Sequence, residues 1–312
     1  MQNRRFQHKA ATGSLTLPVA ALFTACVWLV PGPSDPLRWA GLLCVALTAY
    51  VMVELNNAHS LIRIRSRLIS STFLVLTGSC VFLQADVLRL LPPLFLAAAY
   101  YALFHAYQRA RPEHAVFSAF ACIGIGSLFF PQLLFIVPTF YAAMLFQLHA
   151  FSLRTLLAGL LGLAMPFWIR GAADFYLERP DALLPFFYEL VRVGPPDYSG
   201  IDTHRWAALG VIVCPSVVSI LHFLHTYYND KIRVRMYYYA LLCQVVFILA
   251  ALFALPQHFD VLTSLFIVAA SPLLAHYFAL TENRVTNGFF ILWLIIICYL
   301  TLGNLWTPLW IF

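Results

Sequence analysis

Long apolar runs dominate the chain, and short polar segments separate them. The runs are Thr16–Val30, Trp39–Val53, Leu68–Ala85, Leu90–Tyr107, Ala115–Leu148, Leu153–Ile169, Trp206–His225, Met236–Leu255, Val261–Leu280 and Gly288–Trp306. One helix crosses the hydrocarbon core of a bilayer in about 20 residues. The fifth run is therefore predicted to form two helices, with a turn at GSLFFPQ, where Pro131 lacks a backbone donor. The pattern predicts an all-α, polytopic integral membrane protein with about eleven transmembrane helices.

Composition supports the bilayer as the solvent for most of the chain. Hydrophobic residues make up 62% of the sequence and charged residues 10%, whereas soluble domains have about 45–50% and about 25%. The net charge of +6 comes from short basic clusters between apolar runs. Such clusters are typical of topology signals and do not indicate a nucleic-acid partner.

The distribution of basic residues predicts an orientation. With the N-terminus in the cytoplasm, the short loops on that side hold Arg63, Arg65, Arg67, Arg109, Arg111, Arg154, Lys231, Arg233, Arg235 and Arg284. The short outer loops hold only Arg38 and Arg89. The positive-inside rule favours this arrangement. The predicted topology divides the chain into a cytoplasmic tail (1–15), seven membrane helices (16–169), a periplasmic loop (170–205) and four membrane helices (206–312). The predicted location is a bacterial inner membrane.

The first cytoplasmic loop reads ELNNAHSLIRIRSRLISS, from Glu54 to Ser71. In a helix, Arg63 and Arg67 would share one face and Arg65 would point away. One interpretation is a hinge whose arginines reach anionic lipid headgroups. The other is a pocket in which Arg63 and Arg67 bind phosphate or pyrophosphate, since arginine holds such groups with two hydrogen bonds.

The outer loop between residues 170 and 205 is the longest polar segment. An apolar stripe that includes Leu184, Phe187 and Leu190 predicts a short amphipathic helix at the membrane interface. Asp174 follows Arg170 by four residues, so their side chains are expected to meet. Asp174 is a candidate general base, and solvated loop charge is the alternative interpretation. Asp35 is a second candidate, with a turn residue between two prolines as the alternative.

Histidines lie mostly near the predicted cytoplasmic helix ends. His222 and His225 share a helical face, as metal ligands often do, but the sequence has one HxxH and no HH pair. A histidine-metal oxygenase is therefore a minor alternative, and no metal site is predicted. A transporter is another, although no acid or base lies at mid-bilayer. No sequence motif indicates a particular cofactor.

The segments RIRSRLISSTF and FSAFACIGIGSLFFPQLLFIVPTFYAAMLFQLHAFSLRTLLAGLLGLAMPFWI carry a resemblance. They resemble uncharacterised polytopic inner-membrane proteins of Bacteroidota, some of which carry a β-carotene monooxygenase label. The cadence GIG-x-L-F…R-x-LL-x-x-x-x-G…P is also weakly similar to membrane glycosyltransferases of the GT-C type. Those use an outer acid on lipid-linked sugars, and their acid lies in the first outer loop, which implies Asp35 here.

Two hypotheses follow. The first is an inner-membrane enzyme of cell-envelope biogenesis that acts on a polyprenyl-linked sugar at the outer face. Asp174 or Asp35 would be its base, and Arg170 or Arg89 would hold the pyrophosphate. The second is a non-catalytic subunit or scaffold of an envelope complex, in which the small residues Gly159, Gly162 and Ala164 pack against other membrane subunits. Membrane lipids are expected partners in both.

Overall fold

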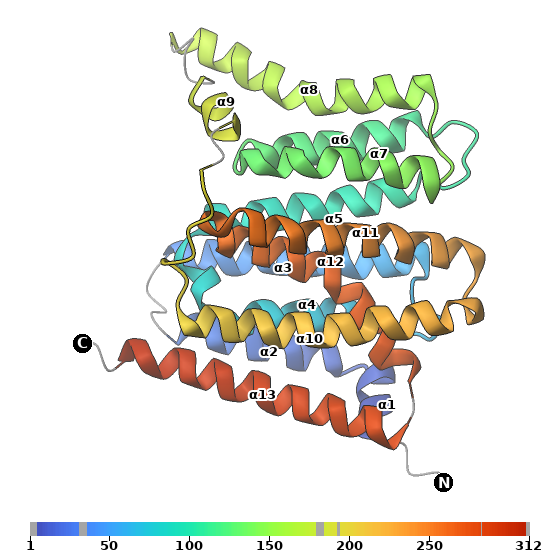
Figure 1. Ribbon diagram of the computed structural model, residues 1–312, viewed down its shortest axis with the longest axis vertical. Coiled ribbons are helices and arrows are strands. Elements are labelled where there is room, and N and C mark those ends of the chain that lie inside the picture. The colour runs from blue at the N-terminus through green and yellow to red at the C-terminus, as the bar shows by residue number, and fades with distance from the viewer. Residues whose placement is uncertain (1–4, 31–35, 179–183, 192–193, 282, 310–312) are drawn as a thin grey trace.

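The computed structural model describes residues 5–30, 36–178, 184–191, 194–281 and 283–309, and its architecture is all-α (Figure 1). The α-helices are α1 (Phe6–Thr12), α2 (Thr16–Leu29), α3 (Pro36–His59), α4 (Leu68–Ser79), α5 (Leu91–Phe104), α6 (Glu113–Ser127), α7 (Val137–Phe146), α8 (Leu153–Tyr176), α9 (Leu184–Val191), α10 (Thr203–Thr226), α11 (Ile232–Ala254), α12 (Phe259–Leu280) and α13 (Arg284–Leu309). Short 3₁₀ helices are η1 (Val81–Ala85), η2 (Val87–Leu90), η3 (Pro131–Ile136), η5 (Tyr227–Asn229) and η6 (Pro256–His258).

The protein is a multi-pass helical membrane protein, but the predicted number of spans is wrong. Among the described residues, seven helices are long and apolar enough to cross a bilayer, or eight if α1 and α2, which meet at a 93° bend, form one broken span. The remaining apolar runs form helices that are too short. For example, α4 has 12 residues and α6 has 15, and at 1.5 Å per residue even 15 residues rise only about 22 Å. A bilayer core is about 30 Å thick.

Breaks inside apolar runs explain the difference. The run that begins at Leu68 ends its α-helix at Ser79 and continues as η1. The fifth run divides as predicted, because α6 ends at Ser127 and η3 begins at Pro131. Hydrophobicity therefore placed the helices well, but it did not reveal where each helix ends.

The long helix α12 forms the centre of the bundle. Every residue of α12 from Phe259 to Ala279 is buried, and α4, α5, α10 and α11 pack around it. Its interior position explains its sequence, which is apolar on all sides. Its ionisable side chains, apart from Tyr277, are Asp260 in the first turn and His276 near the last.

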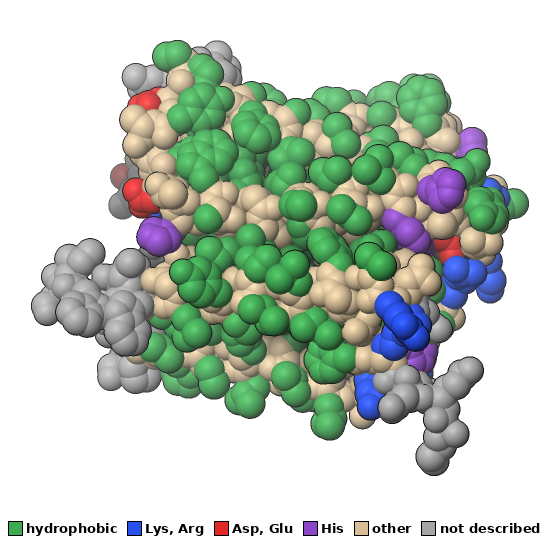
Figure 2. Space-filling view, turned by 60° about the horizontal axis from the view of Figure 1, so that its bottom comes forward, with side chains coloured by type: hydrophobic (Ala, Val, Ile, Leu, Met, Phe, Trp, Pro, Cys, Tyr) green, Lys and Arg blue, Asp and Glu red, His purple; other side chains and the backbone are tan. Residues whose placement is uncertain are grey.

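Successive loops between the long helices lie at opposite ends of the bundle. The segments 60–67, 105–112, 147–152 and 227–231 lie at one end, together with α1 and the start of α13 (Figure 1). All ten arginines and lysines that the sequence assigns to the cytoplasmic loops belong to this end, which we call the basic end. Figure 2 shows lysine and arginine gathered there, with a broad hydrophobic belt between this end and the opposite end.

Helices α6 and α8 approach each other closely through glycines. A Cβ atom on Gly162 would lie 2.4 Å from the carbonyl oxygen of Phe117, and one on Gly124 would lie 2.8 Å from that of Leu163. Gly159 faces the Tyr141 hydroxyl. Gly159 and Gly162, which were predicted to contact other subunits, therefore pack inside this chain.

Candidate functional site

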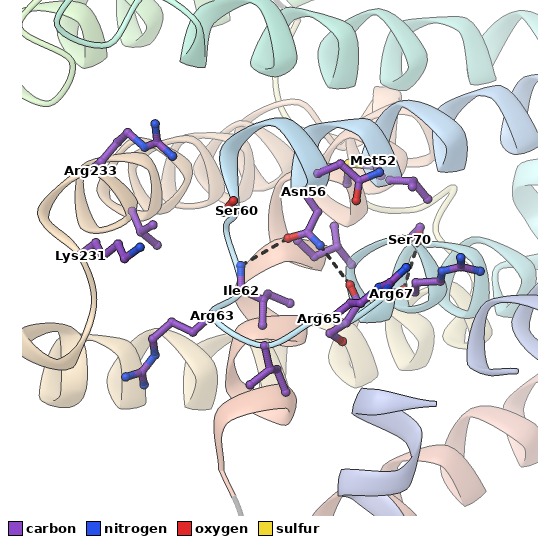
Figure 3. A pocket seen from close by; sticks show the side chains of 16 residues that line it. Met52, Asn56, Ser60, Ile62, Arg63, Arg65, Arg67, Ser70, Lys231 and Arg233 are labelled. Atoms are coloured by element: carbon purple, nitrogen blue, oxygen red, sulfur yellow. Dashed lines mark hydrogen bonds between the residues drawn. The ribbon is translucent and has the colours of Figure 1, made fainter. Parts of the chain in front are cut away.

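A cavity of about 640 Å³ opens at the basic end (Figure 3). Its walls come from the last turns of α3, the irregular segment 60–67, the first turn of α4 and the start of α11. The lining residues are Met52, Val53, Asn56, Asn57, Ser60, Ile62, Arg63, Ile64, Arg65, Ser66, Arg67, Ile69, Ser70, Lys231, Arg233 and Val234. We call this cavity the basic pocket.

The side chain of Asn56 holds the wall of the basic pocket in shape. Its Nδ2 donates to the carbonyl oxygen of Ser66 (3.0 Å), and its Oδ1 accepts from the backbone N–H of Ile62 (3.3 Å) (Figure 3). Ser60, the first residue after α3, adopts a left-handed backbone with φ 52°. The chain therefore turns sharply and crosses the mouth of the pocket without forming a helix.

This irregular path changes the arginine geometry expected from a helix. Arg63, Arg65 and Arg67 all line the same cavity, whereas helical spacing would have turned Arg65 away. Lys231 and Arg233, from the start of α11, lie across the pocket from Arg65 and Arg67 (Figure 3). The sequence had placed these two residues only among topology signals.

The basic pocket carries a strong positive charge. Five of its lining residues are arginine or lysine, and its lining contains no aspartate or glutamate. Within the described part of the chain, Arg63 alone among the five forms an ion pair, through Nε to Asp230 Oδ1 at 3.1 Å. Arg65, Arg67, Lys231 and Arg233 are exposed cations and are free to bind an anionic ligand.

A buried network supports the pocket from inside. Nε2 of His276 on α12 donates to Asp230 Oδ2 over 3.0 Å, and both side chains are buried. The ring of Tyr238 lies against His276, and its hydroxyl donates to the carbonyl oxygen of Leu61 (3.3 Å). The segment that carries the arginines is thus tied to α11 and, through Asp230, to α12.

The chemistry of the basic pocket is that of anion binding. Guanidinium groups match the geometry of phosphate oxygens and bind them with charge-assisted hydrogen bonds. Two serine hydroxyls of the pocket form hydrogen bonds with the backbone. Ser70 donates to the carbonyl oxygen of Arg67, and Ser66 accepts from the N–H of Leu68. The lining holds no carboxylate, histidine or cysteine that could act as a base or nucleophile.

The other residues predicted around this loop are only partly in the pocket. Asn56 and Asn57 line it, but Glu54 and His59 do not. His59 is buried and packs against the rings of Tyr101 and His105. It therefore has a packing role.

The predicted catalytic residues lie elsewhere. Helix α8 continues to Tyr176, so Arg170 and Asp174 belong to its last turns, where Arg170 Nε lies 3.2 Å from Asp174 Oδ2. Their predicted contact is confirmed, but neither residue lines the basic pocket. Asp35 lies outside the described residues. The predicted amphipathic helix is α9, whose Phe186 contacts Phe167 of α8.

Arg89 belongs to a second polar cluster, at the opposite end. It pairs with Asp260 at the start of α12 and with Asp86, and Arg205 approaches Asp260 from α10. Sequence reasoning missed Asp260 and Asp230 as site residues. Their positions in the sequence could have indicated both residues. Asp230 is an acid beside the basic run KIRVR, and Asp260 stands at the start of an apolar run.

Within the described residues, the structure contains no group of three or more histidine, cysteine, aspartate or glutamate side chains that could hold a metal ion. His222 contacts the ring of Tyr277 and the hydroxyl of Thr226. The first is a ring contact and the second is a hydrogen bond.

No protein-family model, curated protein or solved structure matches this chain.

Proposed function

We propose that this protein binds the phosphate or pyrophosphate group of a membrane lipid in its basic pocket. The observation that carries the proposal is a set of four cations, Arg65, Arg67, Lys231 and Arg233, on two sides of one pocket whose lining contains no acid. Within the described residues, none of the four forms an ion pair. Scattered arginines that only reach lipid headgroups need no such cavity. A volume of about 640 Å³ also falls within the range of small-ligand sites, about 300–1,000 Å³.

The proposal includes an orientation and a place in the cell. The basic end faces the cytoplasm, as the positive-inside rule favours, and the membrane is a bacterial inner membrane. The lipid belongs to cell-envelope biogenesis, and a polyprenyl-phosphate-linked glycan is the proposed ligand class. Its phosphate group binds at the cytoplasmic face, whereas the resemblance to GT-C enzymes implies action at the outer face. The lining supports binding, and catalysis by Asp174 or Asp35 has no support from the pocket geometry.

A non-catalytic membrane subunit is the second candidate, and one observation favours it. An apolar groove of about 470 Å³ runs between α1, α2, α4 and α13, with Phe6, Val19, Trp293 and Leu294 among its lining residues. Such an exposed groove is what a scaffold predicts, because it offers a packing surface for another apolar helix.

Native mass spectrometry of the protein extracted from its own membrane tests both candidates. The proposal predicts a retained phosphate-bearing lipid that is lost in Arg65→Gln and Arg233→Gln but kept in the control Arg154→Gln, which lies at the same end outside the pocket. A stoichiometric protein partner without such a lipid would instead support the subunit and would overturn the lipid-binding proposal.

A further inference from the structure

A second polar cavity, of about 470 Å³, lies at the end of the bundle opposite the basic pocket. It forms where η2, the loop before α10 and the start of α12 meet. The lining residues are Arg89, Asp197, Ser199, Gly200, Ile201, Arg205, Pro256, Gln257, His258, Phe259, Asp260 and Val261. We call it the distal pocket.

The loop that closes the distal pocket is held in place. The Tyr198 hydroxyl donates to the carbonyl oxygen of Phe253 on α11 (2.7 Å), and the ring of Trp206 packs against Phe259. The N–H of Ser199 donates to Asp197 Oδ1 (2.9 Å), and hydrogen bonds from the hydroxyl and N–H of Ser199 lower the pKa of Asp197. Asp197 is therefore ionised at neutral pH.

Charges in the distal pocket balance, unlike those in the basic pocket. Two guanidinium groups and two carboxylates line it, and Asp260 lies between Arg89 and Arg205. A charged ligand would compete with one of these arginine–aspartate ion pairs and leave a charged side chain without its counter-ion. That loss is unfavourable in free energy where the side chain is buried. The balance favours a neutral ligand.

Asp260 lines this cavity and carries a buried acceptor oxygen without a hydrogen bond to any described residue. The residue is 6% exposed, and within the described part of the chain its Oδ1 accepts no hydrogen bond. The nearest cation is Arg205, whose Nη1 lies 3.4 Å away. A buried acceptor without a donor costs free energy, so a ligand that donates a hydrogen bond there is stabilised.

From these features we infer that the distal pocket binds a neutral polyhydroxylated group, such as a monosaccharide. A hydroxyl both donates and accepts. It can donate to the carboxylates that line the pocket, those of Asp197 and Asp260, while neighbouring hydroxyls accept from the guanidinium groups and from Gln257 on the rim. The group can reach the pocket as a free sugar or as the headgroup of a glycolipid.

Hydrogen–deuterium exchange of the full-length protein in phosphatidylcholine nanodiscs tests this inference. The probes are methyl β-D-glucoside in solution and glucosyl diacylglycerol in the disc. Either probe is expected to slow amide exchange in residues 197–205 and 256–261. Slowing by the soluble probe indicates a free sugar as a ligand, and slowing by the lipid alone indicates a glycolipid headgroup.

Two glycines in the same loop supply a matched pair of variants. A Cβ on Gly200, which lines the pocket, or on Gly194, which does not, meets no atom within 4 Å, so a side chain can leave the backbone at either position without a clash at Cβ. Gly200→Phe should abolish the slowing and Gly194→Phe should keep it. Gln257→Ala should weaken binding by about three- to tenfold, the effect of one lost hydrogen bond.

The inference fails if neither probe slows exchange, if Gly200→Phe behaves like Gly194→Phe, or if inorganic phosphate displaces the sugar. The double variant Arg65→Gln/Arg67→Gln separates the two proposals. It should lose phosphate-lipid binding at the basic pocket and keep the response to sugar, and loss of the sugar response in it would contradict two independent sites.

Discussion

His276 Nε2 lies 3.0 Å from Asp230 Oδ2 in the interior of the basic end, where the two side chains are only 3% and 2% exposed. The contact joins the central helix α12 to the turn between α10 and α11. Through the other oxygen of Asp230 it reaches Arg63 on the rim of the basic pocket. The shape of the pocket therefore depends on a buried polar pair as well as on apolar packing.

Removal of the buried carboxylate should be strongly destabilising. Asp230→Ala leaves His276 without its acceptor and Arg63 without its counter-charge, and breaking a buried pair costs about 3–5 kcal/mol. Thermal unfolding in a fixed detergent measures the change in the free energy of unfolding. The control is Asp174→Ala, which breaks the i,i+4 pair with Arg170 and should cost less than about 1 kcal/mol. Equal losses in the two variants would show that the Asp230 network contributes no more than a surface pair.

The close approach of α6 and α8 makes a second prediction. Gly162→Ala places a Cβ atom 2.4 Å from the Phe117 carbonyl oxygen, so the helices must separate, at a cost of about 1–3 kcal/mol. Gly210→Ala on α10 is the control, because its Cβ meets open space, and it should be neutral or stabilise by about 0.4–1 kcal/mol. The same unfolding measurement compares them, and a neutral Gly162→Ala would contradict the packing described here.

The proposed orientation is testable with single cysteines in a background that lacks the seven native ones. Asn57→Cys at the basic pocket should react with a membrane-impermeant maleimide only after the cells are permeabilised. Ser199→Cys at the distal pocket should react in intact cells. The positive-inside rule is the physical reason, and the reverse labelling pattern would invert the orientation.

Much of the fold was predictable because the bilayer imposes long apolar helices. The break at Pro131 and the short helix α9 were predicted and are present. The number of spans was not, since nothing in the run beginning at Leu68 marks the end of α4 at Ser79. Hydropathy indicates whether a segment lies in lipid or in water. It does not indicate where a helix ends, because the last hydrogen-bonded turn depends on tertiary packing.

The site was predictable only where its residues are neighbours in sequence. Arg63 and Arg67 were chosen because they share a short loop, and both line the basic pocket. Asp230 and His276 are 46 residues apart, and no local pattern connects them. The helical spacing expected for the arginines also failed, because Asn56 holds the chain in an irregular path through two side-chain hydrogen bonds.

We propose that the basic pocket, and not the general charge of the basic end, recognises phosphate. Calorimetric titration with short-chain phosphatidic acid tests it most directly, with the wild type, Arg65→Gln/Arg67→Gln and Arg111→Gln/Arg154→Gln compared at one salt concentration. Both double variants remove the same charge from the same end, but Arg111 and Arg154 lie outside the pocket.

The account predicts a loss of about 100-fold in affinity for the pocket variant, since each charged hydrogen bond contributes about 1.5 kcal/mol or more. It predicts a loss of less than about threefold for the other variant, because Arg111 and Arg154 do not line the pocket and salt screens the attraction of exposed charges. Equal losses in the two variants would contradict the account and would indicate non-specific attraction of anionic lipid to the basic end.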